Sequence, residues 1–266
     1  MSNQEQLDAI FKRLSTEHGR LNADQQAFAI REIGRVRGEL SDLLADFADT
    51  DGTVKKQRLN RLLRELDAVE TSLRGYGTTA MDEILTETAS WTTTRINNSV
   101  QGVIGVAAVS GGIERLNRDI VNYVARRFES DGLVLSDRVW RLSGDMRDEL
   151  SKVLRADILR GESVGTMIRN IRKVHDNETW KIKRLVVTEG NAAYRTATSF
   201  NAKRSEVVTG LRLIAGVKKS PPCVELADED RHGLGKGIFL PDDSDIYSPH
   251  PNCTSYLTYE LDERWL

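Results

Sequence analysis

The chain has 266 residues, with 38 Lys and Arg against 40 Asp and Glu and a formal net charge of −2 at pH 7. This balance argues against a globally basic nucleic-acid-binding protein, and no apolar run approaches the roughly 18 residues that a membrane helix needs. The first residues lack the basic and apolar blocks of a secretory signal. We therefore expect a cytosolic protein whose two cysteines are reduced or metal-bound.

The first third of the chain predicts amphipathic helices, because apolar residues recur there at spacings of three and four. We expect the first helix to end near Gly19, the second at residues 49–52 and the third at residues 74–77, where glycines interrupt the pattern. The second and third helices are joined by a short turn. They are therefore predicted to pack as an antiparallel hairpin.

The helical pattern is weaker from residue 78 to residue 110, where Thr and Asn clusters and small apolar residues follow one another. Residues 110–112, Ser-Gly-Gly, indicate a break or a hinge. A further helix is predicted over residues 113–128. Residues 1–135 are thus expected to form an elongated helical region.

The next segment predicts three more helices. Ser136 is a suitable N-cap for a helix that ends at Gly161, and Ser163 can cap a short helix with a basic face. A long helix is predicted from residue 178 to residue 208.

The periodicity changes at Gly210, and residues 211–215 and 254–259 alternate as strands do. Between them lies the Pro-, Gly- and Asp-rich stretch 218–252. A loop of this length is uncommon unless something organises it, and a metal ion or a docked partner is the candidate. The predicted fold class is mainly α, with a small α+β module with a β-sheet in residues 136–266.

Soft metal-ligand chemistry gathers in this last stretch. Cys223, His250 and Cys253 offer two thiolates and an imidazole, and structural Zn²⁺ prefers four such ligands in a tetrahedron. Candidates for the fourth ligand are Asp228, Glu225 and His232. The alternative is a proline-locked turn with a buried Cys253 and a surface His250.

A hydrolytic metal site is a second hypothesis. Three ligands and a water would make a catalytic centre, although acidic clusters in such loops are usually solvated. The sequence has no phosphate-binding glycine loop, no nucleophile elbow and no HExxH helix. We therefore expect a protein that is not an enzyme. The residues of the hydrolytic cluster would be Glu225, Asp228, Asp230 and His232.

The long helix at 178–208 carries basic residues that could contact DNA phosphates. Acidic residues are interleaved with them, which favours a solvated helix face instead. The basic residues are Lys181, Lys183, Arg184, Arg195, Lys203 and Arg204.

The order of these features resembles the tailed-phage head morphogenesis family, the Mu F-like minor head proteins, over residues 136–259. The resemblance rests on the Arg-Gly-Glu-Ser at 160–163, Val-Thr-Glu at 187–189, Gly210, Cys223 and Pro-His-Pro-Asn-Cys at 249–253. The chain departs from the family where a second cysteine often follows the first and where another usually follows the last motif.

The resemblance implies a minor structural head protein that associates with the portal protein or the major capsid protein, and with packaged DNA as a further candidate. Such a protein would act in head assembly or in DNA packaging and ejection. It would be found in the host cytoplasm and then in the virion head, with no membrane partner and no small-molecule substrate. The residues themselves leave open a metal-dependent hydrolase or effector built on the C-terminal Cys/His module.

Overall fold

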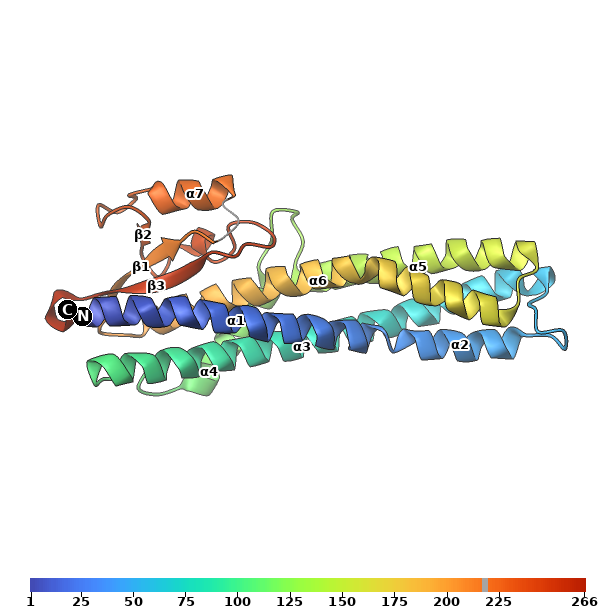
Figure 1. The fold of residues 1–266 in the computed structure, drawn as a ribbon, viewed down its shortest axis with the longest axis horizontal. Helices are drawn as coiled ribbons and strands as arrows, with labels where there is room; N and C mark the ends of the chain where they lie inside the picture. Colours follow the sequence, from blue (N-terminus) through green and yellow to red (C-terminus); the bar gives the residue numbers. More distant parts are fainter. Residues whose placement is uncertain (217–219) are drawn as a thin grey trace. The chain divides into compact units, whose positions relative to one another are not determined.

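The computed structural model describes residues 1–216 and 220–266, and its fold is shown in Figure 1. The chain is mainly α-helical with a small antiparallel sheet near its C-terminal end, which confirms the predicted fold class. None of the helices in the described residues is long and apolar enough to span a membrane. The main elements are α1 (Asn3–Ile33), α2 (Val36–Phe47), α3 (Leu59–Ile104), α4 (Ile113–Arg126), α5 (Leu135–Arg160), α6 (Val164–Lys203), α7 (Pro221–Asp228), β1 (Val208–Ile214), β2 (Ile238–Phe239) and β3 (Tyr256–Leu261).

Two predicted helix ends are wrong, because α1 continues through Gly19 and α3 continues through Gly75 and Gly77. A glycine inside a helix costs only about 1 kcal/mol relative to alanine. Buried side chains recur at helical spacing on both sides of these glycines, and their packing outweighs that cost.

Breaks are predicted correctly where a glycine adopts a left-handed backbone. Gly112 has φ 68° immediately before α4, and Gly161 has φ 75° immediately after α5. A residue with a side chain is strained in this region, so glycine there marks a real helix boundary. The turn predicted at residues 49–52 also follows the end of α2.

The two helices predicted after Ser163 are a single helix, α6. Val174 and His175 are both buried. The polar residues beside them therefore lie on the exposed face of a continuous helix and do not mark a helix end. The stretch 218–252 likewise contains regular structure, namely α7 and β2. Its residues 218 and 219 lie outside the described residues.

The chain divides into two compact units, each built from separate segments. Unit 1 comprises residues 1–25, 82–134 and 186–266, and unit 2 comprises residues 26–81 and 135–185. The domain boundary expected after residue 135 lies next to the boundary between residues 134 and 135, where the chain passes from unit 1 to unit 2. Each unit nevertheless contains segments from before and after residue 135.

Unit 1 packs its sheet against apolar residues of α1. The strand order is β2-β1-β3, and Leu211 in the central strand is paired with Phe239 on one side and Tyr259 on the other. The Tyr259 ring lies 4.6 Å from the ring of Phe11, measured between centroids. Gly210 allows the strands to approach, because a Cβ there would lie 2.9 Å from Ile238 Cγ2. The predicted strands therefore form one side of a hydrophobic core to which the start of α1 also contributes.

Unit 2 is helical, and its first part confirms the predicted antiparallel hairpin. Arg61 near the start of α3 lies over the ring of Phe47 at the end of α2, with 5.5 Å between guanidinium carbon and centroid. Further along α3, and nearer the start of α2, the Tyr76 hydroxyl donates to the Glu39 carboxylate. Contacts that run in opposite directions along α2 and α3 define an antiparallel pair.

Candidate metal centre

The first ligand candidate, Cys223, is fixed by the start of α7. Pro221 and Pro222 occupy the first turn, where a missing backbone N–H leaves no helical hydrogen bond unmade. The backbone N–H of Cys223 donates to the carbonyl of Ser220 at 3.1 Å. The helix start therefore directs Cys223 inward, and only 1% of its surface is exposed.

The other two candidates lie on the turn that contains the His-Pro-Asn-Cys motif. The N–H of Cys253 donates to the carbonyl of His250 at 3.3 Å, which closes the turn. Asn252 takes the left-handed conformation with φ 57°, which Asn tolerates better than most residues. Its N–H donates to Thr188 Oγ1 on α6 at 3.1 Å. The turn thus presents the imidazole and the thiol to the same space.

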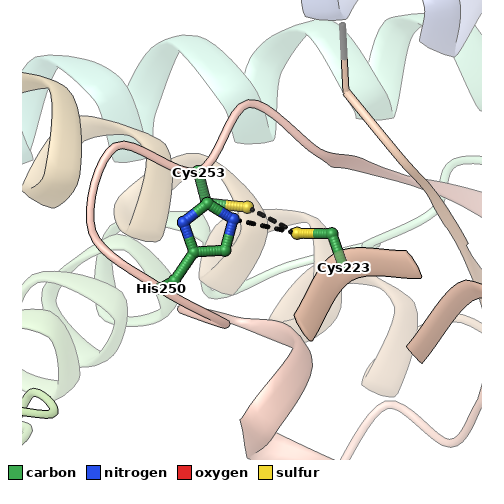
Figure 2. Close-up of side chains that lie close together, drawn as sticks. All are labelled: Cys223, His250 and Cys253. Atoms are coloured by element: carbon green, nitrogen blue, oxygen red, sulfur yellow. Dashed lines mark hydrogen bonds between the residues drawn. The ribbon is translucent and has the colours of Figure 1, made fainter. Parts of the chain in front are cut away.

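Figure 2 shows the three side chains pointing toward one another. Cys223 Sγ lies 3.2 Å from Cys253 Sγ and 3.1 Å from His250 Nε2. The ligand atoms of all three residues lie within 4.8 Å of one another. Three donors at this spacing, from segments about thirty residues apart, could hold one metal ion.

Helix α6 holds the turn through its backbone carbonyls. Arg195 donates from Nε to the carbonyl of Tyr247 at 2.8 Å and from one terminal nitrogen to those of Cys253 and Ser255, at 3.2 and 3.0 Å. Asn191 Nδ2 donates to the Cys253 carbonyl at 2.8 Å. Since Arg195 is only 1% exposed, these bonds are shielded from water and fix the position of Cys253.

A buried ion-pair network supports the beginning of the same turn. Arg127 lies 2.7 Å from the Glu189 carboxylate and 2.6 Å from the Glu129 carboxylate. Ser248 Oγ donates to Glu129 Oε1 at 2.6 Å. Side chains buried to this degree are stable as charges only when they are paired and hydrogen-bonded, as these are.

The electrostatic surroundings distinguish the two thiols. Burial alone favours the neutral form of Cys253, but the nearby Arg195 guanidinium and hydrogen bonds with Ser255 outweigh it and lower the pKa of Cys253. Burial and the hydrogen bond with Cys253 raise the pKa of Cys223. Cys253 is therefore the thiol more easily ionised, and the thiolate is the form that binds metals.

The donor set suits a soft or borderline divalent ion, because two sulfurs and an imidazole nitrogen are the ligands such ions prefer. Two neighbouring hydroxyls complete the surroundings. Ser255 Oγ lies 2.8 Å from Cys253 Sγ, and Ser220 Oγ lies 2.5 Å from His250 Nε2. A tetrahedral ion held by the three donors would keep its fourth position for another ligand.

The structure brings together three of the four predicted metal ligands and leaves out Asp228. The Asp228 carboxylate lies 3.8 Å from Lys236 Nζ, and 70% of its side chain is exposed. The other two candidates for the fourth ligand also point elsewhere, since Glu225 is exposed and His232 Nε2 lies 2.7 Å from Asp243 Oδ2. Cys223 is the buried residue in the first turn of α7, whereas Asp228 is the exposed last residue of the helix.

The acidic hydrolytic cluster suggested by the sequence does not form. Asp230 Oδ1 accepts from the N–H of Gly235 at 3.1 Å and shapes an exposed turn. Within residues 1–216 and 220–266, the Cys223, His250 and Cys253 cluster is the only metal-ligand group that meets this spacing. We therefore interpret the acidic residues of this stretch as groups that stabilise the loop conformation.

Sequence reasoning missed Arg195, which it assigned to a basic helix face. Its helical neighbours carry a signal, because Ala192 lies one turn before it and Ser199 one turn after it, and both are wholly buried. A lone arginine in line with small buried residues points into the core. Its partners there are carbonyls from a distant loop, and no local pattern identifies them.

The comparisons with known proteins leave the site to be interpreted from its own geometry. No protein-family model matches the chain, and no similar protein was found among the curated proteins or the solved structures.

Proposed function

We propose that the chain is a non-enzymatic minor head protein of a tailed bacteriophage. It would associate with the portal protein or the major capsid protein on the inside of the head and act in head assembly or in DNA packaging and ejection. One observation carries the proposal. His250 and Cys253 of the terminal motif, which is the specific part of the resemblance, meet Cys223 in one cluster whose thiols are buried and whose imidazole is half-buried.

The architecture is compatible with this role. The cluster lies on the small sheet-bearing part of the chain, and long helices make up most of the rest. Such helices can offer extended surfaces to other subunits, and a compact terminal module can dock as a rigid body. The role in the head comes from the resemblance, and the helices and the cluster are its physical support.

We further propose that the cluster holds Zn²⁺ as a structural ion. Cys223 and Cys253 would bind as thiolates and His250 through Nε2, which is the ring nitrogen beside Cys223 Sγ. His250 Nδ1 lies 2.8 Å from the carbonyl of Pro251, and this contact would set the tautomer that leaves Nε2 free for the metal. A bound ion would link α7 to the turn that follows β2.

Co-expression with the cognate portal protein tests the role in the head. Tagged portal oligomers should retain the untagged chain through size-exclusion chromatography. The double variant Cys223→Ser/Cys253→Ser should lose that association if the module docks, while Asp228→Asn serves as a matched control outside the cluster. Failure of the wild-type chain to co-purify with either portal or capsid protein would refute the proposal.

A metal-dependent hydrolase is the second candidate function, and the three-donor set is the observation that favours it. Catalytic zinc sites commonly use three protein ligands and keep a water in the fourth position. Purified protein would be incubated with nucleic acid or casein, with and without added Zn²⁺. Metal-stimulated cleavage that disappears in His250→Ala would establish the enzyme, and no cleavage under any of these conditions would exclude it for these substrates.

A further inference from the structure

Unit 2 contains a cleft at the junction of α1 and α2. The cleft has a volume of about 440 Å³ and is lined by residues of 34–41 on one side and by Ile168, Ile171 and Arg172 of α6 on the other. This volume lies within the range of pockets that bind small molecules or a protruding part of a larger ligand.

Two arginines that line this cleft have no acidic partner among the residues that the structure describes. Arg37 Nε donates to the carbonyl of Gly34 at 3.2 Å, and in the described part of the chain neither Arg37 nor Arg172 forms an ion pair with a carboxylate. The third, Arg35, pairs with Glu32 at 3.1 Å and lies over the ring of Tyr76. The cleft therefore presents two positive charges that nothing within unit 2 neutralises.

A buried histidine stands behind the cleft. His175 is only 3% exposed, and neither ring nitrogen makes a hydrogen bond among the described residues, although Nδ1 lies 3.6 Å from the Asp176 carboxylate. A Cβ on Gly34 would lie 3.2 Å from His175 Nε2, so this nitrogen faces the backbone that lines the cleft. Burial, followed by the charge of Arg37, lowers the pKa of His175. The imidazole therefore packs behind the Gly34 backbone, which itself lines the cleft.

The lining as a whole fits one kind of ligand. Arginine guanidinium groups bind phosphate oxygens with two parallel hydrogen bonds. Ile168 and Ile171 supply an apolar wall beside them. Gly34 and Gly38 add no side chain to the opposite wall, so Arg37 has room there. A phosphate attached to a sugar would place its charge between the arginines and its ring against the isoleucines.

We infer that the cleft binds a phosphate group carried by a sugar, either in a polynucleotide backbone or in a free nucleotide. The inference does not depend on the role in the head. Arg37 and Arg172 would hold the phosphate oxygens, and His175 would stabilise the inner end of the cleft.

The surroundings favour the polynucleotide over the free nucleotide. Arg169 and Lys173 flank Arg172 on α6, both are exposed, and neither pairs with a carboxylate in the described residues. Unit 2 also carries 21 Lys and Arg against 17 Asp and Glu, in a chain whose total is slightly acidic. Positive charge beyond the cleft would contact neighbouring phosphates of a strand.

Fluorescence anisotropy with an end-labelled DNA duplex tests the inference on the full-length protein. Arg37→Gln/Arg172→Gln should weaken binding at least about tenfold and lower the slope of log K against log salt by about 1.8, since each phosphate contact contributes about 0.9. The matched control is Lys56→Gln/Arg64→Gln, which removes two exposed positive charges from the same unit outside the cleft. Circular dichroism would verify that both variants remain folded.

Competition identifies the source of the phosphate. AMP and inorganic phosphate would be titrated against the labelled duplex, and calorimetry would measure AMP binding directly. Duplex binding lost in the cleft variant assigns a polynucleotide, and AMP binding without duplex binding assigns a free nucleotide. Equal weakening in the control variant, binding of neither ligand, or equal competition by a poly-glutamate peptide would each overturn the inference.

Discussion

Arg195 is the side chain on which the position of the candidate metal ligands most depends. It reaches from α6 to three carbonyls of the segment 247–255, and no other described side chain makes more than one of these contacts. In Arg195→Gln most of these bonds disappear and buried carbonyls are left without donors. We expect a loss of about 3 kcal/mol or more in the free energy of unfolding, measured by urea denaturation.

The control for this prediction is Arg204→Gln. Arg204 directly follows the last residue of α6, but it is exposed and pairs only loosely with Asp119, at 3.4 Å. Its replacement should cost less than about 1 kcal/mol. Equal losses in the two variants would show that Arg195 has no special part in holding the turn.

His18 predicts how stability depends on pH. It is buried, stacks on the Tyr194 ring with 4.4 Å between centroids, and burial followed by the charge of Arg195 lowers its pKa to about 3. Below pH 6.5 the unfolded chain binds a proton at this site and the native chain does not, so stability falls as pH falls. At pH 5, the titration of His18 has lowered the free energy of unfolding by about 2 kcal/mol.

His18→Phe keeps an aromatic ring in the stack and removes the titration. Urea denaturation of this variant should show a shallower loss of stability between pH 6.5 and pH 5 than the wild type. His232→Gln, at a partly exposed histidine that contacts Asp243, provides the comparison. An unchanged pH slope in His18→Phe would contradict the buried neutral imidazole.

At the residue scale, the sequence predicts the three donors but not what positions them. The chain has only two cysteines, and one of its four histidines stands three positions before Cys253, so residue type and spacing mark Cys223, His250 and Cys253. The sequence offers Asp228, Glu225 and His232 as the fourth ligand, and none of them reaches the cluster. The direction of a side chain on α7 and the burial of Arg195 are consequences of tertiary packing, which no local pattern encodes.

At the element scale, Gly75 and Gly77 of α3 predict opposite effects of the same substitution. A Cβ at Gly75 meets nothing within 4 Å, whereas a Cβ at Gly77 would lie 2.9 Å from Val139 Cγ1. Gly75→Ala should therefore stabilise the protein by about 1 kcal/mol through helix propensity, and Gly77→Ala should destabilise it through overpacking. Thermal denaturation compares them, and the same sign for both would contradict the close packing at Gly77.

The same two positions explain why helix type was predicted better than helix length. Apolar periodicity identifies an amphipathic helix wherever one face is buried, and it does so on both sides of each interrupted stretch. A glycine, however, is compatible with a turn, with a close contact or with an ordinary exposed helical position. Gly112 and Gly161 are of the first kind, Gly77 of the second and Gly75 of the third, and only the surrounding structure distinguishes them.

At the scale of the whole molecule, unit 1 depends on segments from both ends of the chain. Phe11 packs on Tyr259, Asn3 Nδ2 donates to the carbonyl of Trp265 at 2.9 Å, and Arg127 pairs with Glu189. A fragment of residues 136–266 lacks all three N-terminal partners. We expect this fragment to lose the dispersed NMR signals of the sheet that the full chain shows. A fragment with the full set of native sheet signals would mean that the terminal module folds independently.

We propose that Cys223, His250 and Cys253 form one metal centre that organises the end of the chain. Elemental analysis of the untagged protein, alongside Cys223→Ser, Cys253→Ser and the control Asp228→Asn, measures whether this centre holds a metal ion. We predict close to one Zn²⁺ per chain in the wild type and in Asp228→Asn, and almost none in either cysteine variant. A wild-type protein without bound metal, with both cysteine variants folded and equally stable, would contradict the claim and leave a buried, proline-shaped turn in its place.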